Sequence, residues 1–215
     1  MADLNPARHH LLSHSLLLIL FWAVVFIRYL LLENLNPAGM YYPVYCPLDD
    51  MIPFCEIFLI PYVFWYFFMM GMHLYTILYD QMSFRQYTKF LIFCFGISTV
   101  IFLIFPSCQN LRPTVLPRDN ILIRAVRLLY RTDTNTNVFP SEHVIGAIAV
   151  FVAAMHTQNL RTPWKLAIIG LTSLFICLST LFLKQHSVLD TVAAVLICIL
   201  AYLVCYRKRN RRGSD

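Results

Sequence analysis

His186 and Asp190 stand four residues apart, just after Lys184. If the chain is helical from Ser187 onward, this spacing places the histidine and the aspartate on one face. The carboxylate can then hold the imidazole in a single tautomer and orientation, as a nucleophile requires. Such pairs also occur as structural hydrogen bonds, so the surrounding sequence must indicate where this pair lies.

Two further polar clusters interrupt the apolar sequence. One contains Arg112, and the other contains Ser141, Glu142 and His143. Ionisable groups at membrane depth cost about 2.5 to 3.5 kcal/mol each on insertion scales, so they are usually paired and functional. Two histidines, a carboxylate, a lysine and an arginine together suit attack on a phosphate group and stabilisation of its charge. Each cluster alone is also explained by a helix cap or a loop.

The composition predicts a membrane protein. Of the 215 residues, 59% are hydrophobic and 13% are charged, whereas a soluble domain is roughly half apolar and a quarter charged. The apolar residues form blocks of about 20 residues, which match the bilayer's hydrocarbon thickness. A single all-α membrane domain is expected over residues 1–215. The basic residues behind the net charge of +6 form no groove-facing run, so no nucleic-acid partner is expected.

Six apolar blocks predict a six-transmembrane-helix bundle. Their approximate limits are residues 11–32, 54–79, 90–105, 141–156, 163–183 and 187–206. Between the third and fourth blocks, residues 120–131 have arginines three and four positions apart among apolar residues, which predicts a short interfacial helix. Its Arg124 and Arg127 either form a face wetted by water and lipid headgroups or guide an anionic headgroup toward the site.

The distribution of lysine and arginine predicts the orientation of the chain. An even number of spans places both termini on one side of the membrane. The short loops on that side and the basic tail at residues 207–215 are rich in lysine and arginine. By the positive-inside rule, both termini are therefore expected in the cytoplasm. His186 then lies at the outer face, and we expect a multi-pass protein of the plasma membrane.

The chain has seven cysteines. Four of them fall within the apolar blocks, where they are expected to be small buried hydrophobic residues. The three near predicted loops are Cys46, Cys55 and Cys108. A disulfide between two of these remains open, although no framework spacing supports it.

Together, the three polar clusters resemble the active-site signature of the type 2 phosphatidic acid phosphatase superfamily, which includes lipid phosphatases and phosphotransferases. The signature is Lys-x6-Arg-Pro, then Pro-Ser-Gly-His, then Ser-Arg-x5-His-x3-Asp. The matching stretches are Arg112-Pro113, Pro140-Ser141-Glu142-His143 and Ser179-Thr180-x5-His186-x3-Asp190. The segment from Asp133 to Phe139 is more similar to the inositol-phosphorylceramide and sphingomyelin synthases of the superfamily.

The sequence departs from the signature at three positions. Phe105 and Thr180 replace a lysine and an arginine, so two phosphate-binding cations are missing, and Glu142 replaces a glycine. Lys184 is close enough to His186 in sequence to replace one cation. The arginines of the predicted interfacial helix are candidates for the other. A carboxylate beside a phosphate pocket is electrostatically unfavourable. The side chain at position 142 must therefore point away from that pocket, pair with an arginine, or contact a cationic group of the substrate.

The resemblance implies a mechanism without a metal or another cofactor. His186 attacks the phosphorus and forms a phosphohistidine, Asp190 orients its ring, and His143 protonates the leaving alcohol. The expected phosphate-binding groups are Lys184, Arg112 and the N–H groups around Ser141, with headgroup contacts from Glu142, Arg124 and Arg127.

The predicted partners are a lipid phosphate substrate and the surrounding membrane lipids. If water accepts the phosphoryl group, the protein is a phosphatase acting on an amphiphilic phosphomonoester or pyrophosphate. With a lipid or headgroup alcohol, it is a phosphotransferase. A membrane protein that binds or moves lipid without catalysis is the alternative of a different class. The sequence leaves the exact lipid and the oligomeric state open.

Overall fold

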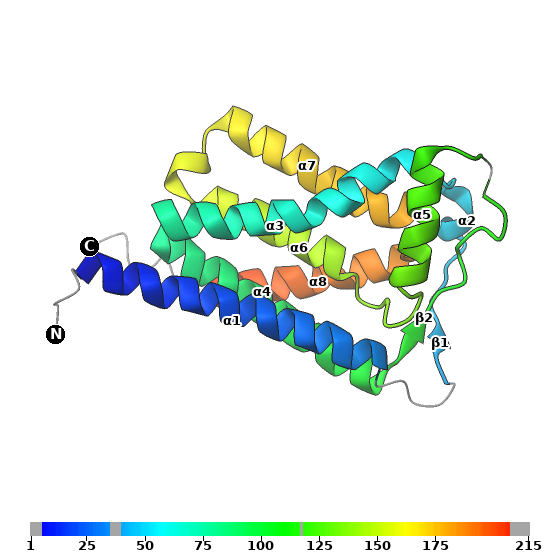
Figure 1. The fold of residues 1–215 in the computed structure, drawn as a ribbon, viewed down its shortest axis with the longest axis horizontal. Coiled ribbons are helices and arrows are strands. Elements are labelled where there is room, and N and C mark those ends of the chain that lie inside the picture. Colours follow the sequence, from blue (N-terminus) through cyan, green and yellow to red (C-terminus); the bar gives the residue numbers. More distant parts are fainter. Residues whose placement is uncertain (1–5, 35–39, 117, 207–215) are drawn as a thin grey trace.

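The protein is built from helices that run side by side (Figure 1). The computed structural model describes residues 6–34, 40–116 and 118–206, so the predicted basic tail at 207–215 lies outside the described residues. The helices are α1 (Pro6–Asn34), α2 (Leu48–Met51), α3 (Leu59–Tyr79), α4 (Gln81–Ile104), α5 (Ile121–Thr132), α6 (Glu142–His156), α7 (Pro163–Phe182) and α8 (Val188–Cys205). Short 3₁₀ turns cover Glu56–Phe58 and Gln158–Leu160, and the strands β1 (Tyr42–Pro43) and β2 (Ser107–Cys108) form a parallel pair.

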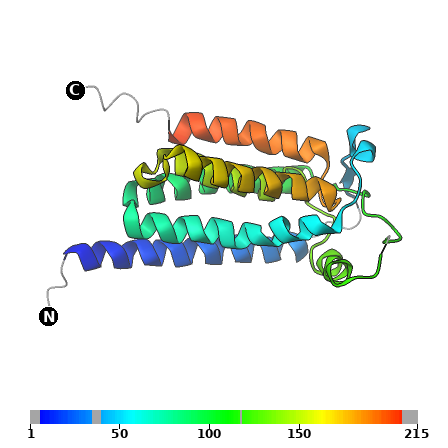
Figure 2. The ribbon, with the colours of Figure 1, turned by 90° about the horizontal axis from the view of Figure 1, so that it is seen from above.

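Five helical segments of the described chain are long and apolar enough to cross a membrane. They belong to α1, α3 with its preceding turn, α4, α7 and α8, whereas α6 is apolar but shorter, with 15 residues. The prediction of an all-α polytopic membrane protein is therefore confirmed. The start of α1 and the end of α8 lie at the same end of the bundle (Figure 1), and Figure 2 shows these two helices on opposite sides of it.

Helix α6 is the centre of the bundle. It packs against α3, α4, α7 and α8, and most of its residues are buried. Small residues such as Gly146, Ala149 and Ala153 lie along it, and small side chains allow neighbouring helices to approach closely. An apolar helix of this length is typical of a core position. Four neighbouring helices therefore enclose α6.

Helix α4 begins earlier than the apolar block suggested. The third apolar block predicted a start at about residue 90, but α4 begins at Gln81 and includes Arg85 and Lys89. Asp80 accepts hydrogen bonds from Ser83 N at 2.9 Å and from Ser83 Oγ at 2.7 Å. This cap satisfies one of the free backbone donors of the first turn. The helix can therefore continue through polar residues ahead of its apolar part.

The short helix predicted over residues 120–131 is present as α5. Asn120 caps it by accepting a hydrogen bond from Ile123 N at 2.8 Å. Ile123 and Val126 are buried against the protein, whereas Arg124 is exposed. Helix α5 lies across one end of the bundle (Figure 1). This amphipathic arrangement is compatible with the predicted position in the membrane interface.

All seven cysteines lie in the described part of the chain, and all are free thiols. The disulfide that the sequence left open among Cys46, Cys55 and Cys108 is therefore not formed. Cys94 and Cys198 lie within the hydrophobic core, as expected for small apolar side chains.

The close packing of α6 generates a prediction. A Cβ atom at Gly146 would lie 2.4 Å from Met69 Sδ and 2.4 Å from Trp65 Nε1. We expect Gly146→Ala to lower the free energy of unfolding by about 1 to 3 kcal/mol, because overpacking displaces the neighbours. Gly96→Ala is the matched control, since a Cβ there meets nothing within 4 Å. Thermal unfolding in detergent measures both, and an unchanged melting temperature for Gly146→Ala would contradict the packing.

Candidate active site

The start of α8 positions His186 and Asp190. Ser187 is the N-cap, and its backbone N–H donates to Asp190 Oδ2 at 2.9 Å. His186 Nδ1 lies 3.1 Å from the same oxygen and 3.0 Å from Val138 O. Both partner atoms are acceptors, so Nδ1 carries the proton and Nε2 keeps its lone pair. The two side chains thus make the contact that their spacing suggested.

His143, in the first turn of α6, faces His186. The centroids of the two imidazole rings are 6.3 Å apart. The His143 ring stacks on Tyr62 with centroids 4.0 Å apart and packs against Trp65 at 4.4 Å. Its Nε2 atom is buried and has no hydrogen-bond partner among the described residues. A buried polar atom without a partner calls for an explanation, and a bound ligand would supply one.

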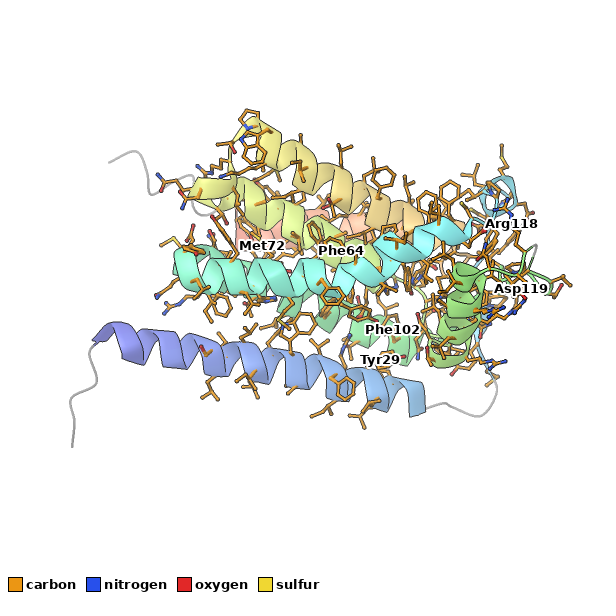
Figure 3. The ribbon with its side chains drawn as sticks, turned by 45° about the horizontal axis from the view of Figure 1, so that its top comes forward. Tyr29, Phe64, Met72, Phe102, Arg118 and Asp119 are labelled. Carbon is orange, nitrogen blue, oxygen red and sulfur yellow. The ribbon has the colours of Figure 1, made fainter. Side chains whose placement is uncertain are left out.

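Both histidines line a cavity of about 530 Å³. Its charged wall residues are Arg28, Asp133 and Glu142, and its aromatic wall residues include Trp22, Phe26, Tyr29, Trp65, Tyr66 and Phe102. Figure 3 marks Tyr29 on α1 and Phe102 on α4. Phe26, Tyr29 and Tyr66 are also exposed on the outside of the bundle. The cavity therefore extends from the histidines to the surface between α1 and α3.

Arg28 was not among the residues selected from the sequence, yet it lines the cavity. Its two terminal nitrogens donate to Glu142 Oε1 at 2.7 Å and Glu142 Oε2 at 2.5 Å, and one of them also donates to Thr99 Oγ1 at 3.0 Å. The Glu142 carboxylate thus pairs with an arginine, which was one of its three expected arrangements. The available signal was an arginine within an apolar span, where charged residues usually face the interior of the bundle.

Asp133 is the second cavity carboxylate, and it too was not among the residues expected from the sequence to lie at the site. Its Oδ2 atom accepts hydrogen bonds from Tyr62 Oη at 2.8 Å and from Gln185 Nε2 at 3.3 Å. Nothing in the local sequence indicated that this loop residue would reach α3.

Within residues 6–34, 40–116 and 118–206, no group of three or more His, Cys, Asp or Glu side chains could hold a metal ion.

Ser141 directly precedes α6. Its side chain does not cap α6, and its buried hydroxyl has no partner in the described structure. Its backbone N–H donates to Asp190 O at 3.2 Å. Ser141 is also absent from the cavity wall. Its visible role is therefore to join the starts of α6 and α8.

Arg112, expected to bind phosphate, is occupied by other acceptors. Its guanidinium donates to Tyr130 O at 3.1 Å, and to Asp133 O and Thr134 O at 2.8 Å each. It also donates to Gln185 Oε1. The residue does not line the cavity. Arg112 therefore ties the loop after α5 to the connection between α7 and α8.

Lys184, expected to replace a missing cation, points into a different pocket. Its Nζ donates to Asp49 O at 2.5 Å, and it lines a separate pocket with Asp50 and Tyr45. Burial lowers the pKa of Lys184, while the carboxylates of Asp49 and Asp50 act in the opposite direction. A positive φ of 53° at Lys184 marks a sharp turn. Such a turn redirects the chain, so nearness to His186 in sequence does not bring the lysine into the cavity.

The arginines on α5 also lie away from the cavity. Arg124 Nε and Arg127 Nη1 are 3.5 and 3.4 Å from Asp119 Oδ1, and neither residue lines the cavity. Figure 3 shows Asp119 at the end of the molecule, beside α5. Both arginine side chains are exposed, so any headgroup contact they make is at the surface.

Asp49, in the short helix α2, supports the start of α8 from a distant part of the sequence. Its Oδ2 accepts from Ser187 Oγ at 2.7 Å, and its Oδ1 accepts from Val188 N at 2.8 Å. The residue is 2% exposed. A carboxylate at a helix N-terminus is favoured by the helix dipole. The sequence showed only an acidic loop, with no sign of its partner.

This support generates a second prediction. Asp49→Ala should lower the free energy of unfolding by about 1 to 3 kcal/mol, because the buried Ser187 hydroxyl and Val188 N–H lose their acceptor. Asp50→Ala is the matched control, since Asp50 is exposed and accepts from Tyr45 Oη. Melting temperatures in detergent compare the two variants. Equal effects would show that the Asp49 contacts do not stabilise α8.

Comparisons with known proteins identify the family. A family model described as the PAP2 superfamily matches residues 87–214, which include the two histidines and Asp190 but not Arg28 or Asp49. Comparisons with curated proteins and with solved structures found no match. Members of the superfamily are phosphatases and phosphotransferases, so the match supports an enzyme of this general type. The match covers more than half of the chain, and the chain therefore belongs to the PAP2 superfamily.

Proposed function

We propose that the protein is a membrane lipid phosphatase that acts on an amphiphilic phosphomonoester or pyrophosphate through a phosphohistidine. The observation that carries the proposal is the pair of imidazoles at one cavity, with the Asp190 carboxylate hydrogen-bonded to His186. Membership of the PAP2 superfamily supports this general class of reaction.

In the first step, His186 Nε2 attacks the phosphorus and forms a P–N bond, while the bond from phosphorus to the leaving alcohol oxygen breaks. Protonated His143 donates its proton to that oxygen, so the alcohol leaves neutral. The His186 ring becomes positively charged. Asp190 stabilises this charge through the Nδ1–H hydrogen bond.

In the second step, water attacks the phosphorus and the P–N bond breaks. His143, now neutral, accepts the proton of the water. Inorganic phosphate leaves, and both histidines return to their starting protonation states. Holding the reacting groups in one cavity lowers the entropic cost of each step.

The aromatic part of the cavity supports an amphiphilic substrate. The phosphate would lie at the histidines, and the apolar chain would leave between α1 and α3 past Phe26, Tyr29 and Tyr66. Phosphatidate, phosphatidylglycerol phosphate and polyprenyl pyrophosphate have this form. We further propose a plasma-membrane location with cytoplasmic termini and an outward-facing site. The exposed Arg124 and Arg127 would then lie at the outer membrane surface, where the basic face of an amphipathic helix contacts anionic headgroups.

Transfer to an alcohol is the second candidate function. The carboxylates of Asp133 and Glu142 line the cavity and could accept a hydrogen bond from an incoming hydroxyl group. The similarity of residues 133–139 to the lipid phosphotransferases of the superfamily also favours transfer. An acceptor alcohol would then take the place of water in the second step.

The mechanism predicts the effect of removing each histidine. His186→Ala should abolish phosphate release, because no phosphoenzyme can form. His143→Ala should lower the rate about 10²- to 10⁴-fold, the usual contribution of general acid–base catalysis. His156→Ala, at the other end of α6 and outside the cavity wall, is the matched control and should retain activity.

These rates are measured as phosphate release from a panel of lipid phosphates in detergent, with size-exclusion profiles to verify folding. If the purified wild-type protein neither releases phosphate nor transfers a headgroup across the panel, the enzyme proposal is wrong. Lipid binding without turnover would then support the non-catalytic alternative.

The choice between water and an alcohol generates a further prediction. For a phosphatase, adding diacylglycerol or another lipid alcohol to the assay should leave the amount of released phosphate unchanged. Radiolabelled lipid phosphate allows both products to be counted in one reaction. A labelled lipid product that replaces free phosphate would instead identify a phosphotransferase.

A further inference from the structure

We propose that Arg28 is the cation that binds the substrate phosphate, and that Glu142 is the counterion of Arg28 with which the phosphate competes. This inference rests on the proposed function, because it specifies how that site takes phosphate. It concerns a part of the chain outside the family match, since residue 28 precedes the matched residues 87–214.

A phosphate group in this cavity needs a cation. Moving an anion out of water is unfavourable unless a positive group pairs with it. Asp133 and Glu142 line the same cavity and add negative charge. Among the cavity-lining residues of the described chain, Arg28 is the only lysine or arginine. The charge balance of the cavity therefore depends on Arg28.

Other cations at this end of the bundle are engaged elsewhere. The Arg112 guanidinium donates to three backbone carbonyls and a glutamine. Lys184 donates to a carbonyl and lines a separate pocket. Arg118 pairs with Glu56 at 2.9 Å. None of these three basic residues lines the cavity that contains the histidines.

The geometry of the ion pair allows the guanidinium to bind a second anion. Glu142 accepts one hydrogen bond from each terminal nitrogen of Arg28, and Nη1 also donates to Thr99 Oγ1 at 3.0 Å and to Phe95 O at 3.3 Å. A guanidinium has five N–H donors, so the second N–H of Nη2 has no acceptor among the described residues. Arg28 Nε is buried without a partner in the described structure. Arg28, Glu142 and His143 line the same cavity, so the guanidinium shares that cavity with the imidazole proposed to protonate the leaving group.

An ion pair that only joined α1 to α6 would make the same contacts. The two roles differ in how charge affects phosphate binding. In a purely structural pair, Arg28→Gln and Glu142→Gln break the same contact and should have the same effect. In a binding pair they should have opposite effects, because Arg28 attracts phosphate and Glu142 repels it.

The test measures inorganic phosphate binding to the full-length protein in detergent, from the rise in melting temperature with phosphate concentration. Arg28→Gln should weaken binding about 10- to 100-fold, as expected for losing a charged hydrogen-bond partner. Glu142→Gln should tighten binding about fivefold, as expected for losing one nearby like charge. Arg28→Lys keeps the charge but not the forked geometry, so its affinity should lie between wild type and Arg28→Gln.

Arg118→Gln is the matched control. It removes the arginine of a second Arg–Glu pair near this end of the molecule, and Arg118 is marked in Figure 3. Phosphate binding should be unchanged in this variant. If Arg28→Gln does not fold, Arg28→Lys and Glu142→Gln still test the inference, because they should shift the affinity in opposite directions.

Unchanged phosphate binding in Arg28→Gln, equal effects of the two glutamine variants, or a wild-type protein that binds no phosphate would each overturn the inference. The binding assay needs no turnover, so a failure of this inference can be distinguished from a failure of the proposed function. If no lipid releases phosphate but phosphate binding still depends on Arg28, the phosphatase proposal fails and the role of Arg28 stands.

Discussion

A backbone hydrogen bond from Ser141 N to Asp190 O, 3.2 Å long, joins the starts of α6 and α8. His143 lies in the first turn of α6, and His186 lies just before α8, so this contact brings the two imidazoles to one cavity. The first N–H groups of a helix have no acceptor within the helix itself. At these two helix starts, the Asp190 carbonyl and the Asp49 carboxylate supply acceptors. The site therefore depends on how two neighbouring helices satisfy their first donors.

The packing of α6 and the geometry of the site are linked through Trp65. Its Nε1 atom lies 2.4 Å from the place where a Cβ at Gly146 would be, and its ring lies 4.4 Å from that of His143. A closely packed interior transmits displacement because it has little free volume. A larger residue at position 146 would therefore move a wall of the cavity as well as strain the core.

Local features of the sequence predicted much of the fold and part of the site. Long apolar blocks predicted a polytopic all-α protein, and the spacing of the arginines among the apolar residues of 120–131 predicted α5. The four-residue separation of His186 and Asp190 predicted their contact. Each of these predictions depends on interactions within one helix or its first turn, where sequence spacing directly sets distance. The early start of α4 was missed because hydropathy gave more weight to the apolar block than to the Asp80 cap.

The sequence by itself determined the helices, their membrane character and the pairing of His186 with Asp190. Only the tertiary structure decided which charged groups reach the cavity. Lys184 is near His186 in the chain but turns into another pocket, whereas Arg28 enters from α1 and pairs with Glu142. The physical reason is that both outcomes depend on packing between segments distant in the sequence. This packing sets the direction of a side chain after a tight turn, and it also sets which helix lies beside the cavity. Neither can be obtained from spacing along the chain.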